Sequence, residues 1–414
     1  MKSFFSKTKW RILAVVVSMA ACGMLAINLW LNWELSSARE LAEDQQWKAA
    51  RGFLGRYLMF RPSDAKARIL MSHCLISDNS LTIQNVATEA LNCLAAIPNS
   101  SPQSATARII EGRVYLLLLL QPARAEQKFQ LALQSDSTRI DAHALLWKVY
   151  ELTRRWHLCD EHFWQIYSHT QTAERANLLR DWYLSEFHPG SAIADLDRKL
   201  GILKSDEKPS AAVERRRYEM FIAAEPDSPL GYTCLAQWFH QNGLISKGQE
   251  AIKKAEQIAG GSENPFVIAT QVAMSFELGE FNEAQEQFRH WPVNDKGFEY
   301  WKTKGLIDDQ ILRDNEQARD AYTHVLSTEF GKSEWMTHHR LAQVLMRMNL
   351  RDEAAVMRNH SKELELQMEP NVHQPLREAL AQPESIETQE RMARFYERIG
   401  RQRESSAWRE LSQR

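Results

Sequence analysis

A repeating pair of short amphipathic helices constrains the fold of this 414-residue chain more than any other feature of its sequence. The clearest copy spans residues 227–262 and consists of two helical stretches joined by a turn at Gly243. In the first stretch Leu235, Ala236 and Phe239 fall on one apolar stripe, and glycine suits the left-handed turn that ends a helix. Neither helix can bury its apolar face alone, whereas a stack of such pairs can.

The second helix of the pair carries a small residue followed four positions later by a large one. This spacing recurs at Gly248/Ile252, Ala50/Leu54, Ala90/Leu94, Ala125/Phe129, Cys159/Phe163, Ala284/Phe288 and Ala318/Tyr322. The small residues are 40, 35 and 34 residues apart in the first half, and 36, 34 and 36 apart from Gly248 to Ala354. A period in this range indicates stacked helical repeats. We therefore predict an all-α fold, a right-handed α-solenoid of about nine helix pairs.

Taken together, the residues of the clearest copy form the pattern Leu235-Ala236-x2-Phe239, Gly243, Gly248-x3-Ile252-x2-Ala255. This pattern resembles the tetratricopeptide repeat (TPR), a helix–turn–helix unit of 34 residues. The resemblance covers residues 34–170 and 227–414, while residues 171–226 are helical in pattern but match poorly. It implies a protein-interaction scaffold whose concave groove is lined by the first helix of each pair. The clamp of Lys, Arg and Asn with which some members of the family hold peptide C-termini is not visible here.

An uncharged stretch, residues 12–33, precedes the repeats almost without a linker. About 20 apolar residues are enough for a helix to cross a membrane. Lys2, Lys7, Lys9 and Arg11 precede the stretch and Glu34 follows it, so the positive-inside rule keeps the N-terminus cytoplasmic. We predict a single-pass signal-anchor in the inner (cytoplasmic) membrane, with the repeats on the periplasmic side.

Two alternatives to a retained anchor remain open. A secretory signal would be cleaved, and residues 19–23 resemble a bacterial lipobox in which Cys22 would carry the lipid. The apolar run continues for about ten residues beyond Cys22, which favours a retained helix. All three outcomes place the repeats outside the cytoplasm.

The predicted organisation of the chain has five parts. They are residues 1–11, a basic cytoplasmic segment; 12–33, the transmembrane helix; 34–187, an N-terminal TPR-like array; 188–226, an irregular helical connector; and 227–414, a C-terminal TPR-like array. The last helix, residues 403–414, is strongly polar apart from Trp408, as a terminal cap requires.

The residues that could carry chemistry favour a non-catalytic protein. The five cysteines include no CxxC pair and are odd in number, so they imply no disulfide framework. The formal charge of −2 gives no basic field for nucleic acid. The segment from His157 to His162 looks most like a metal site, but its ligands diverge on a helix and Cys159 occupies a core position, so we expect neither a metal nor a cofactor. The sequence contains no P-loop, G-x-G-x-x-G or G-x-S-x-G motif.

The resemblance assigns the groove to residues on the solvent-facing side of each first helix, where a protein or peptide would bind. Carried over by repeat position, these are Lys148, Thr233, Gln237, His240, Gln241, Ala273, Phe276, Glu277, Lys302, His339, Gln343, Met346, Arg347, Arg394 and Arg398, with Leu152 and Ala269 on the same faces. The set mixes polar, apolar and oppositely charged side chains, which suits an extended peptide or a helix of another protein.

The alternative function is an enzyme or small-ligand-binding protein with its site in the irregular central segment, residues 171–226. A deep pocket there with convergent Asp181, His188 or the run Arg215, Arg216 and Arg217 would favour it.

Overall fold

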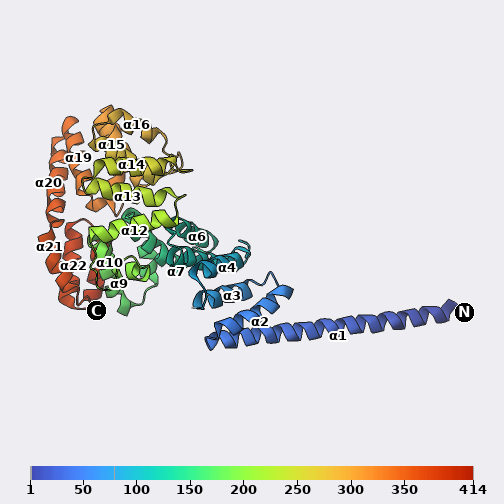
Figure 1. Cartoon of the computed structure of the whole chain (residues 1–414). Coiled ribbons are helices and arrows are strands. Elements are labelled where there is room, and N and C mark those ends of the chain that lie inside the picture. The colour runs from blue at the N-terminus through green and yellow to red at the C-terminus, as the bar shows by residue number, and fades with distance from the viewer. Residues whose placement is uncertain (1, 79, 414) are drawn as a thin grey trace. The chain divides into compact units, whose positions relative to one another are not determined.

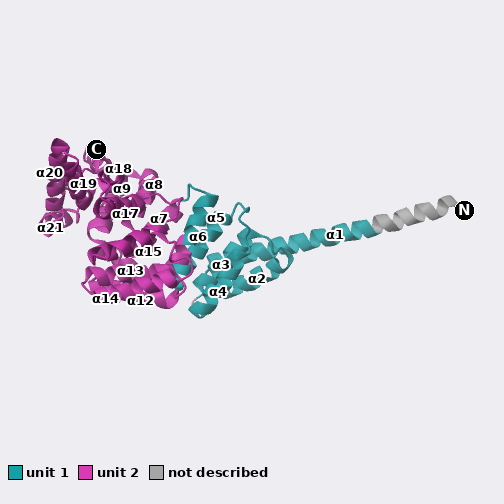
Figure 2. Cartoon of the chain, turned by 90° about the horizontal axis from the view of Figure 1, so that it is seen from above, with its two compact units in different colours: residues 1–119, 127–139 teal, residues 120–126, 140–414 magenta. Residues whose placement is uncertain are grey.

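The computed structural model describes residues 2–78 and 80–413, with side chains from Val16 onward, so the side chains of the predicted basic segment 1–11 lie outside the described residues. All secondary structure in this part of the chain is helical, in agreement with the predicted all-α solenoid. The chain divides into two compact units, coloured in Figure 2. Unit 1 comprises residues 1–119 and 127–139, and unit 2 comprises residues 120–126 and 140–414.

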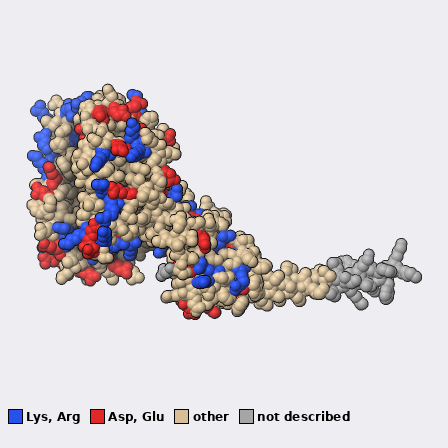
Figure 3. All heavy atoms as spheres, viewed as in Figure 1, with Lys and Arg blue, Asp and Glu red and all other residues tan. Residues whose placement is uncertain are grey.

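Unit 1 holds the first repeats. Its elements are α1 (Lys2–Glu43), α2 (Trp47–Phe60), α3 (Ala65–Ser77), α4 (Ile83–Ala95), α5 (Ser104–Arg113), the π-helical turn η1 (Val114–Leu118) and most of α6 (Pro122–Ser135). Within unit 1, the stretch Val16–Glu43 of α1 is long and apolar enough to cross a membrane. Only 6% of the most apolar 18 residues in this stretch is buried in the protein. Figure 3 shows the described outer part of α1 without charged side chains.

The apolar helix continues into the first repeat without a break. α1 is one helix from Lys2 to Glu43, the long ribbon of Figure 1. Leu31, Glu34 and Ala38 of α1 are buried in unit 1, and Leu31 and Ala38 share a core cluster with Leu54 of α2. The same helix therefore supplies both the candidate membrane span and the first helix of the first pair.

Unit 2 holds the remaining repeats and the connector. Its elements are α7 (Ile140–Leu152), η2 (Trp156–Leu158), α8 (Cys159–His169), α9 (Thr172–Phe187), α10 (Pro189–Ala192), α11 (Ala194–Lys199), α12 (Ala211–Ala224), α13 (Pro229–Gln241), α14 (Ile245–Gln257), α15 (Pro265–Glu277), α16 (Phe281–Arg289), α17 (Phe298–Ile307), η3 (Asp308–Leu312), α18 (Asn315–Ser327), η4 (Gly331–Ser333), α19 (Trp335–Arg347), α20 (Arg351–Gln367), α21 (Pro370–Ala379), α22 (Ile386–Arg398) and α23 (Gln402–Ser412).

The turn inside most helix pairs passes through one residue in the left-handed conformation. This residue is Gln45, Leu120, Arg154, Gly243, Gly279, Arg313, Asn349 or Gly400. The pair α3–α4 turns instead through a longer loop. Glycine adopts a positive φ without strain, but the other residue types do so at a cost, so packing of the two helices must hold those turns in place. The helix pairs of the described chain thus agree with the predicted number.

The predicted small residues of the second helices are in the core. Ala50, Ala90, Ala125, Cys159, Ala284, Ala318 and Ala354 are all completely buried. Glycines on the first helices make equally close contacts, because a Cβ atom added to Gly112 would lie 2.3 Å from a ring carbon of Phe129. In unit 2 the same addition at Gly305 would lie 2.5 Å from the ring of Tyr322. The close approach of the two helices in a pair therefore depends on a missing side chain.

Gly112→Ala is expected to lower the free energy of unfolding by about 1–3 kcal/mol, because the new methyl group must displace the Phe129 ring. Gly52→Ala is the matched control within unit 1, since its added Cβ meets no atom within 4 Å. That change removes a flexible residue from an exposed position of α2 and is expected to raise the free energy of unfolding by about 0.5–1 kcal/mol. Urea unfolding of both variants in detergent measures the difference, and equal effects would contradict the packing account.

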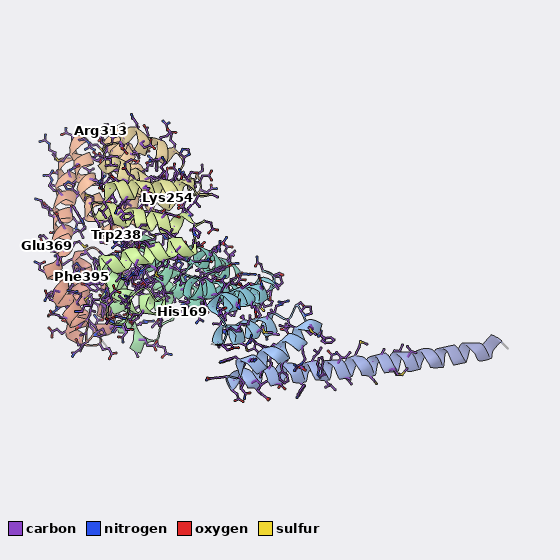
Figure 4. All side chains as sticks on the ribbon, viewed as in Figure 1. His169, Trp238, Lys254, Arg313, Glu369 and Phe395 are labelled. Atoms are coloured by element: carbon purple, nitrogen blue, oxygen red, sulfur yellow. The ribbon has the colours of Figure 1, made fainter. Side chains whose placement is uncertain are left out.

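The C-terminal pair, α22 and α23, packs back against α8 and α9. Glu404, Ser405, Ala407 and Trp408 form the buried face of α23. Phe395 of α22, labelled in Figure 4, has its ring centroid 5.4 Å from that of Phe187 in α9. The predicted polar outer face of this helix is present, since Arg403, Ser406 and Arg409 are exposed, while the opposite face of α23 packs inside unit 2.

A fully buried arginine holds this contact. Arg401 donates to Glu404 from Nε at 2.9 Å and to Glu186 of α9 from Nη1 at 3.1 Å. Its guanidinium lies 3.8 Å from Asp160 of α8, and the indole of Trp182 donates to Glu404 at 3.4 Å. Three carboxylates therefore surround Arg401, whose charge they more than balance. Removing one partner from such a buried set leaves an uncompensated charge and is strongly destabilising.

Glu186 is expected to make the stability of this contact depend on pH. Burial raises the pKa of Glu186 to about 7, even though Arg401 opposes the shift. Because the folded chain then holds this proton more tightly than the unfolded chain, the free energy of unfolding falls as the pH rises from about 4.5 through about 7, by up to about 3 kcal/mol.

The Glu186→Gln variant lacks this titration, so its stability relative to the wild type should change between pH 5 and pH 7.5. Urea unfolding of the full chain in detergent at both pH values tests this, with the exposed Glu174→Gln of the same helix as the control. A wild-type-to-variant difference that is the same at both pH values would refute the shift.

Candidate functional site

The first helices of three consecutive pairs in unit 2 line a groove. α13, α15 and α17 contribute its long sides, and the turn after α7 contributes one end. The cavity holds about 310 Å³ and is lined by Arg154, His157, Gln237, His240, Gln241, Phe266, Ala269, Thr270, Val272, Ala273, Met274, Glu277, Glu299, Lys302, Thr303 and Leu306. Proline or a capping side chain starts two of these helices: Ser228 accepts a hydrogen bond from Leu230 before Pro229 opens α13, and Asn264 precedes Pro265 at the start of α15 in the same way.

Seven of the residues that the resemblance assigns to a groove line this cavity. They are Gln237, His240, Gln241, Ala269, Ala273, Glu277 and Lys302. The two alanines are small and lie one helical turn apart on α15, so they leave the floor open. Phe266, Val272 and Leu306 make the floor apolar.

Polar side chains on neighbouring first helices pair across the rim. His240 Nε2 of α13 lies 2.6 Å from Glu277 Oε2 of α15. Gln237 donates from Nε2 to Thr270 Oγ1 at 3.0 Å. Glu277 remains 69% exposed despite this contact, so one of its carboxylate oxygens is available to a bound segment.

Lys302 keeps a positive charge on the opposite side. Its Nζ donates to Glu334 at 2.8 Å, and it lies over the ring of Phe298 at 5.6 Å. Desolvation lowers its pKa, but the carboxylates of Glu334 and Glu299 outweigh this and raise the pKa above the ordinary lysine value. The rim thus offers a carboxylate on α15 and an ammonium group on α17.

Arg154 and His157, from much earlier in the chain, complete the groove. Position within a repeat does not assign either residue to it. His157 stacks on Phe298 with centroids 5.4 Å apart, and its Nδ1 lies 3.3 Å from Glu299. Burial lowers its pKa, so the ring is neutral at neutral pH. Arg154 donates to Glu214 at 2.8 Å and also contacts Gln241. Position within a repeat could not predict the contacts with Phe298 and Gln241, because they join the turn after α7 to helices more than 80 residues later.

Several predicted groove residues instead serve the fold. Thr233 is completely buried and donates to the carbonyl of Pro229 at 2.8 Å. Phe276 is half-buried against the core of its pair, with its ring 5.1 Å from that of Phe281. Lys148 donates to Glu151 at 2.7 Å. Leu152 is fully buried as well.

The predicted residues of the later repeats lie outside the cavity. His339, Gln343, Met346 and Arg347 are exposed on α19, and Arg394 and Arg398 are exposed on α22. Arg347 pairs with Asn315 at 2.8 Å and with Asp309, and Arg394 lies 3.5 Å from Glu390. They remain candidate contacts only if a bound segment extends beyond α17.

A second cavity, of about 370 Å³, lies in the irregular central segment of unit 2. Its lining comprises Glu151, Arg154, His188, Pro189, Gly190, Ser191, Ile193, Asp197, Pro209, Ser210, Ala211, Val213, Glu214 and Arg217. Of the residues that the alternative function requires, His188 and Arg217 line this cavity. Asp181 bonds Arg180, Arg215 bonds Glu219 and Arg216 bonds Glu207, all away from it.

The charges of this second cavity are largely paired. Arg217 donates to both carboxylate oxygens of Asp197, at 2.8 and 2.6 Å, and this pair is almost completely buried. Burial lowers the pKa of His188 to about 4, helped by Arg377 and His373, so its ring is neutral. The Arg217–Asp197 pair therefore joins α11 to α12 within the connector, residues 188–226.

The histidine side chains of the segment from His157 to His162 do not converge on one point. His157 belongs to the groove, whereas His162 lies 2.7 Å from His143 through their Nδ1 atoms. Burial and the neighbouring His143 lower the pKa of His162 to about 4. Cys159 is completely buried. Within residues 2–78 and 80–413, no group of three or more His, Cys, Asp or Glu side chains could hold a metal ion.

Asp197→Asn is expected to destabilise unit 2 by about 3–5 kcal/mol, because it leaves the buried Arg217 without its counter-charge. Asp195→Asn on the same short helix is the control, since Asp195 is 90% exposed and pairs only with Arg198 at the surface. That substitution should change the free energy of unfolding by about 0.5 kcal/mol or less. Denaturant titration of the two variants decides the matter, and similar losses would show that the pair does not hold the connector.

Comparisons with known proteins find only distant similarity, and only among solved structures. No protein-family model matches the sequence, and no curated protein matches it. Among solved structures, the APC/C hetero-tetramer Cut9-Hcn1 is 13% identical, with 93% of this chain and 90% of that chain covered and a TM-score of 0.36. The TPR domain of P58(IPK) is 16% identical, with 92% of both chains covered and a TM-score of 0.28.

A bacterial neighbour has a similar score. A tetratricopeptide repeat protein from Parabacteroides merdae is 12% identical, with 70% of this chain and 98% of that chain covered and a TM-score of 0.31. At such scores no single neighbour carries an argument. The helix pairs, their left-handed turns and their small–large contacts are what identify the fold as a TPR-like solenoid.

Proposed function

We propose that this protein is a membrane-anchored, non-catalytic scaffold that holds a segment of another protein in the groove formed by α13, α15 and α17. The observation that carries the proposal is the composition of that groove. An apolar floor with two alanines lies between a carboxylate rim at Glu277 and an ammonium rim at Lys302. Such a surface accepts apolar side chains below and polar or charged groups along both edges.

The features of α1 support the proposed anchor. Its exposed apolar stretch satisfies the length and composition of a membrane span, and the basic residues before it favour a cytoplasmic N-terminus with the repeats on the periplasmic side. Because α1 enters the first repeat as one helix, the array would stay close to the bilayer. Confinement there raises the local concentration of membrane-associated partners without any new contact.

A photo-crosslinking amino acid in place of Glu277 is expected to capture a discrete protein partner from membranes, because this side chain stands at the open rim of the groove. Glu286 on α16 is the matched control, since it is also a glutamate and is similarly exposed, at 57% against 69%. The measurement is mass spectrometry of the crosslinked bands. Equal capture from both positions, or none from Glu277, would contradict groove binding.

A small-ligand site in the central cavity is the second candidate function. The observation in its favour is that His188 and Arg217 converge there with Ser191, Ser210 and Glu214. It ranks second because the arginines of the cavity are already paired with Asp197 and Glu214, which leaves little charge for a ligand.

A further inference from the structure

The first helix hairpin of unit 1 places the end of α2 beside the apolar stretch of α1. Arg61, directly after α2, donates to Asn28 of α1 at 2.7 Å. At the preceding residue of the chain, the ring of Phe60 has its centroid 5.5 Å from that of Trp30 in α1. These contacts fall within residues 12–33, the stretch expected to lie in the membrane.

Helix dimensions fix the level of this contact. An α-helix rises 1.5 Å per residue, so about 20 residues cross a hydrocarbon core of about 30 Å. Counted from Ile12, where charged residues end, this length reaches Leu31, which is level with the last turn of α2. The end of α2 therefore meets α1 where the hydrocarbon core gives way to the lipid headgroups.

The side chains at this level match a membrane interface. Met59 is 74% exposed and Phe60 is 55% exposed, on the same hairpin as the exposed Trp33. Arg61 is exposed beside them. Aromatic rings and arginines that extend to the headgroups are typical of residues at the bilayer surface.

The acidic residue of α1 that directly follows the apolar stretch is paired with a basic neighbour. Glu34 is 2% exposed, and Arg56 of α2 donates to its Oε1 at 3.0 Å. A buried, paired carboxylate carries a smaller desolvation penalty near the hydrocarbon core than a free one would. At this level the hairpin thus presents apolar and basic groups outward while Glu34 is covered.

We propose that the end of α2, Met59 and Phe60 with Arg61, inserts into the headgroup layer of the same bilayer that α1 spans. The occupant of this apolar surface is lipid, because the surface is continuous with the exposed face of α1 at Leu29 and Trp33. The inference rests on the proposed membrane anchor. It adds that the first repeat contacts the membrane at a second point, which restricts the tilt of this repeat relative to the bilayer.

Spin labels on the full chain in vesicles of phosphatidylcholine and phosphatidylglycerol test the inference. Single cysteines at Met59, Leu25 and Ile83 would be placed in a background with the five native cysteines changed to alanine. Leu25 reports the span, and Ile83 of α4 is the control, because both are 62% exposed. Collision rates with oxygen and with a water-soluble nickel chelate then distinguish lipid from water.

The expected result is loss of nickel access and gain of oxygen access at Met59 and Leu25 relative to Ile83. A label at Met59 that behaves like Ile83, while Leu25 remains in lipid, overturns the inference and leaves the anchor intact. A label at Met59 shielded from both reagents indicates a protein neighbour, such as a second copy of the chain, and also overturns it. Nickel access at Leu25 would overturn the anchor itself.

Discussion

The close approach of two helices at a residue with little or no side chain is the contact on which the rest of this structure depends. Ala318 and Gly305 let α17 and α18 meet across the ring of Tyr322, and Gly112 does the same against Phe129. Because van der Waals contact falls away quickly with distance, this fit sets the spacing of each pair. Equal spacing in successive pairs aligns their first helices, α13, α15 and α17. The alignment of these three helices creates the groove.

Unit 2 adds a contact that ordinary repeat stacking does not require. Arg401 is buried among Glu404, Glu186 and Asp160, residues separated from it by up to 241 positions, so α23 packs on α8 and α9. A buried charged set of this kind contributes little net stability compared with apolar packing, but it is specific in geometry. It fixes the position of α23 on α8 and α9 within unit 2.

The sequence predicted the parts of this fold that depend on local spacing. The small residues of the second helices, the turn at Gly243 and seven residues of the groove followed from position within a repeat. Left-handed turns at Arg154 or Asn349 carried no such signal, because packing rather than residue type imposes them. His157 in the groove and Arg401 in the core could not be predicted, since each depends on contacts between helices far apart in the sequence. The groove positions on α19 and α22 remain predictions.

The central claim is tested most directly by measuring the affinity of the captured partner for variants in which the groove is filled. Ala273→Trp would fill the open floor between α13 and α17, whereas Val356→Trp adds the same ring to an exposed position on α20. The account predicts at least about tenfold weaker binding for Ala273→Trp, which is a loss of about 1.4 kcal/mol or more, and unchanged binding for Val356→Trp. Unchanged affinity for Ala273→Trp, in a variant that retains wild-type stability, would contradict it.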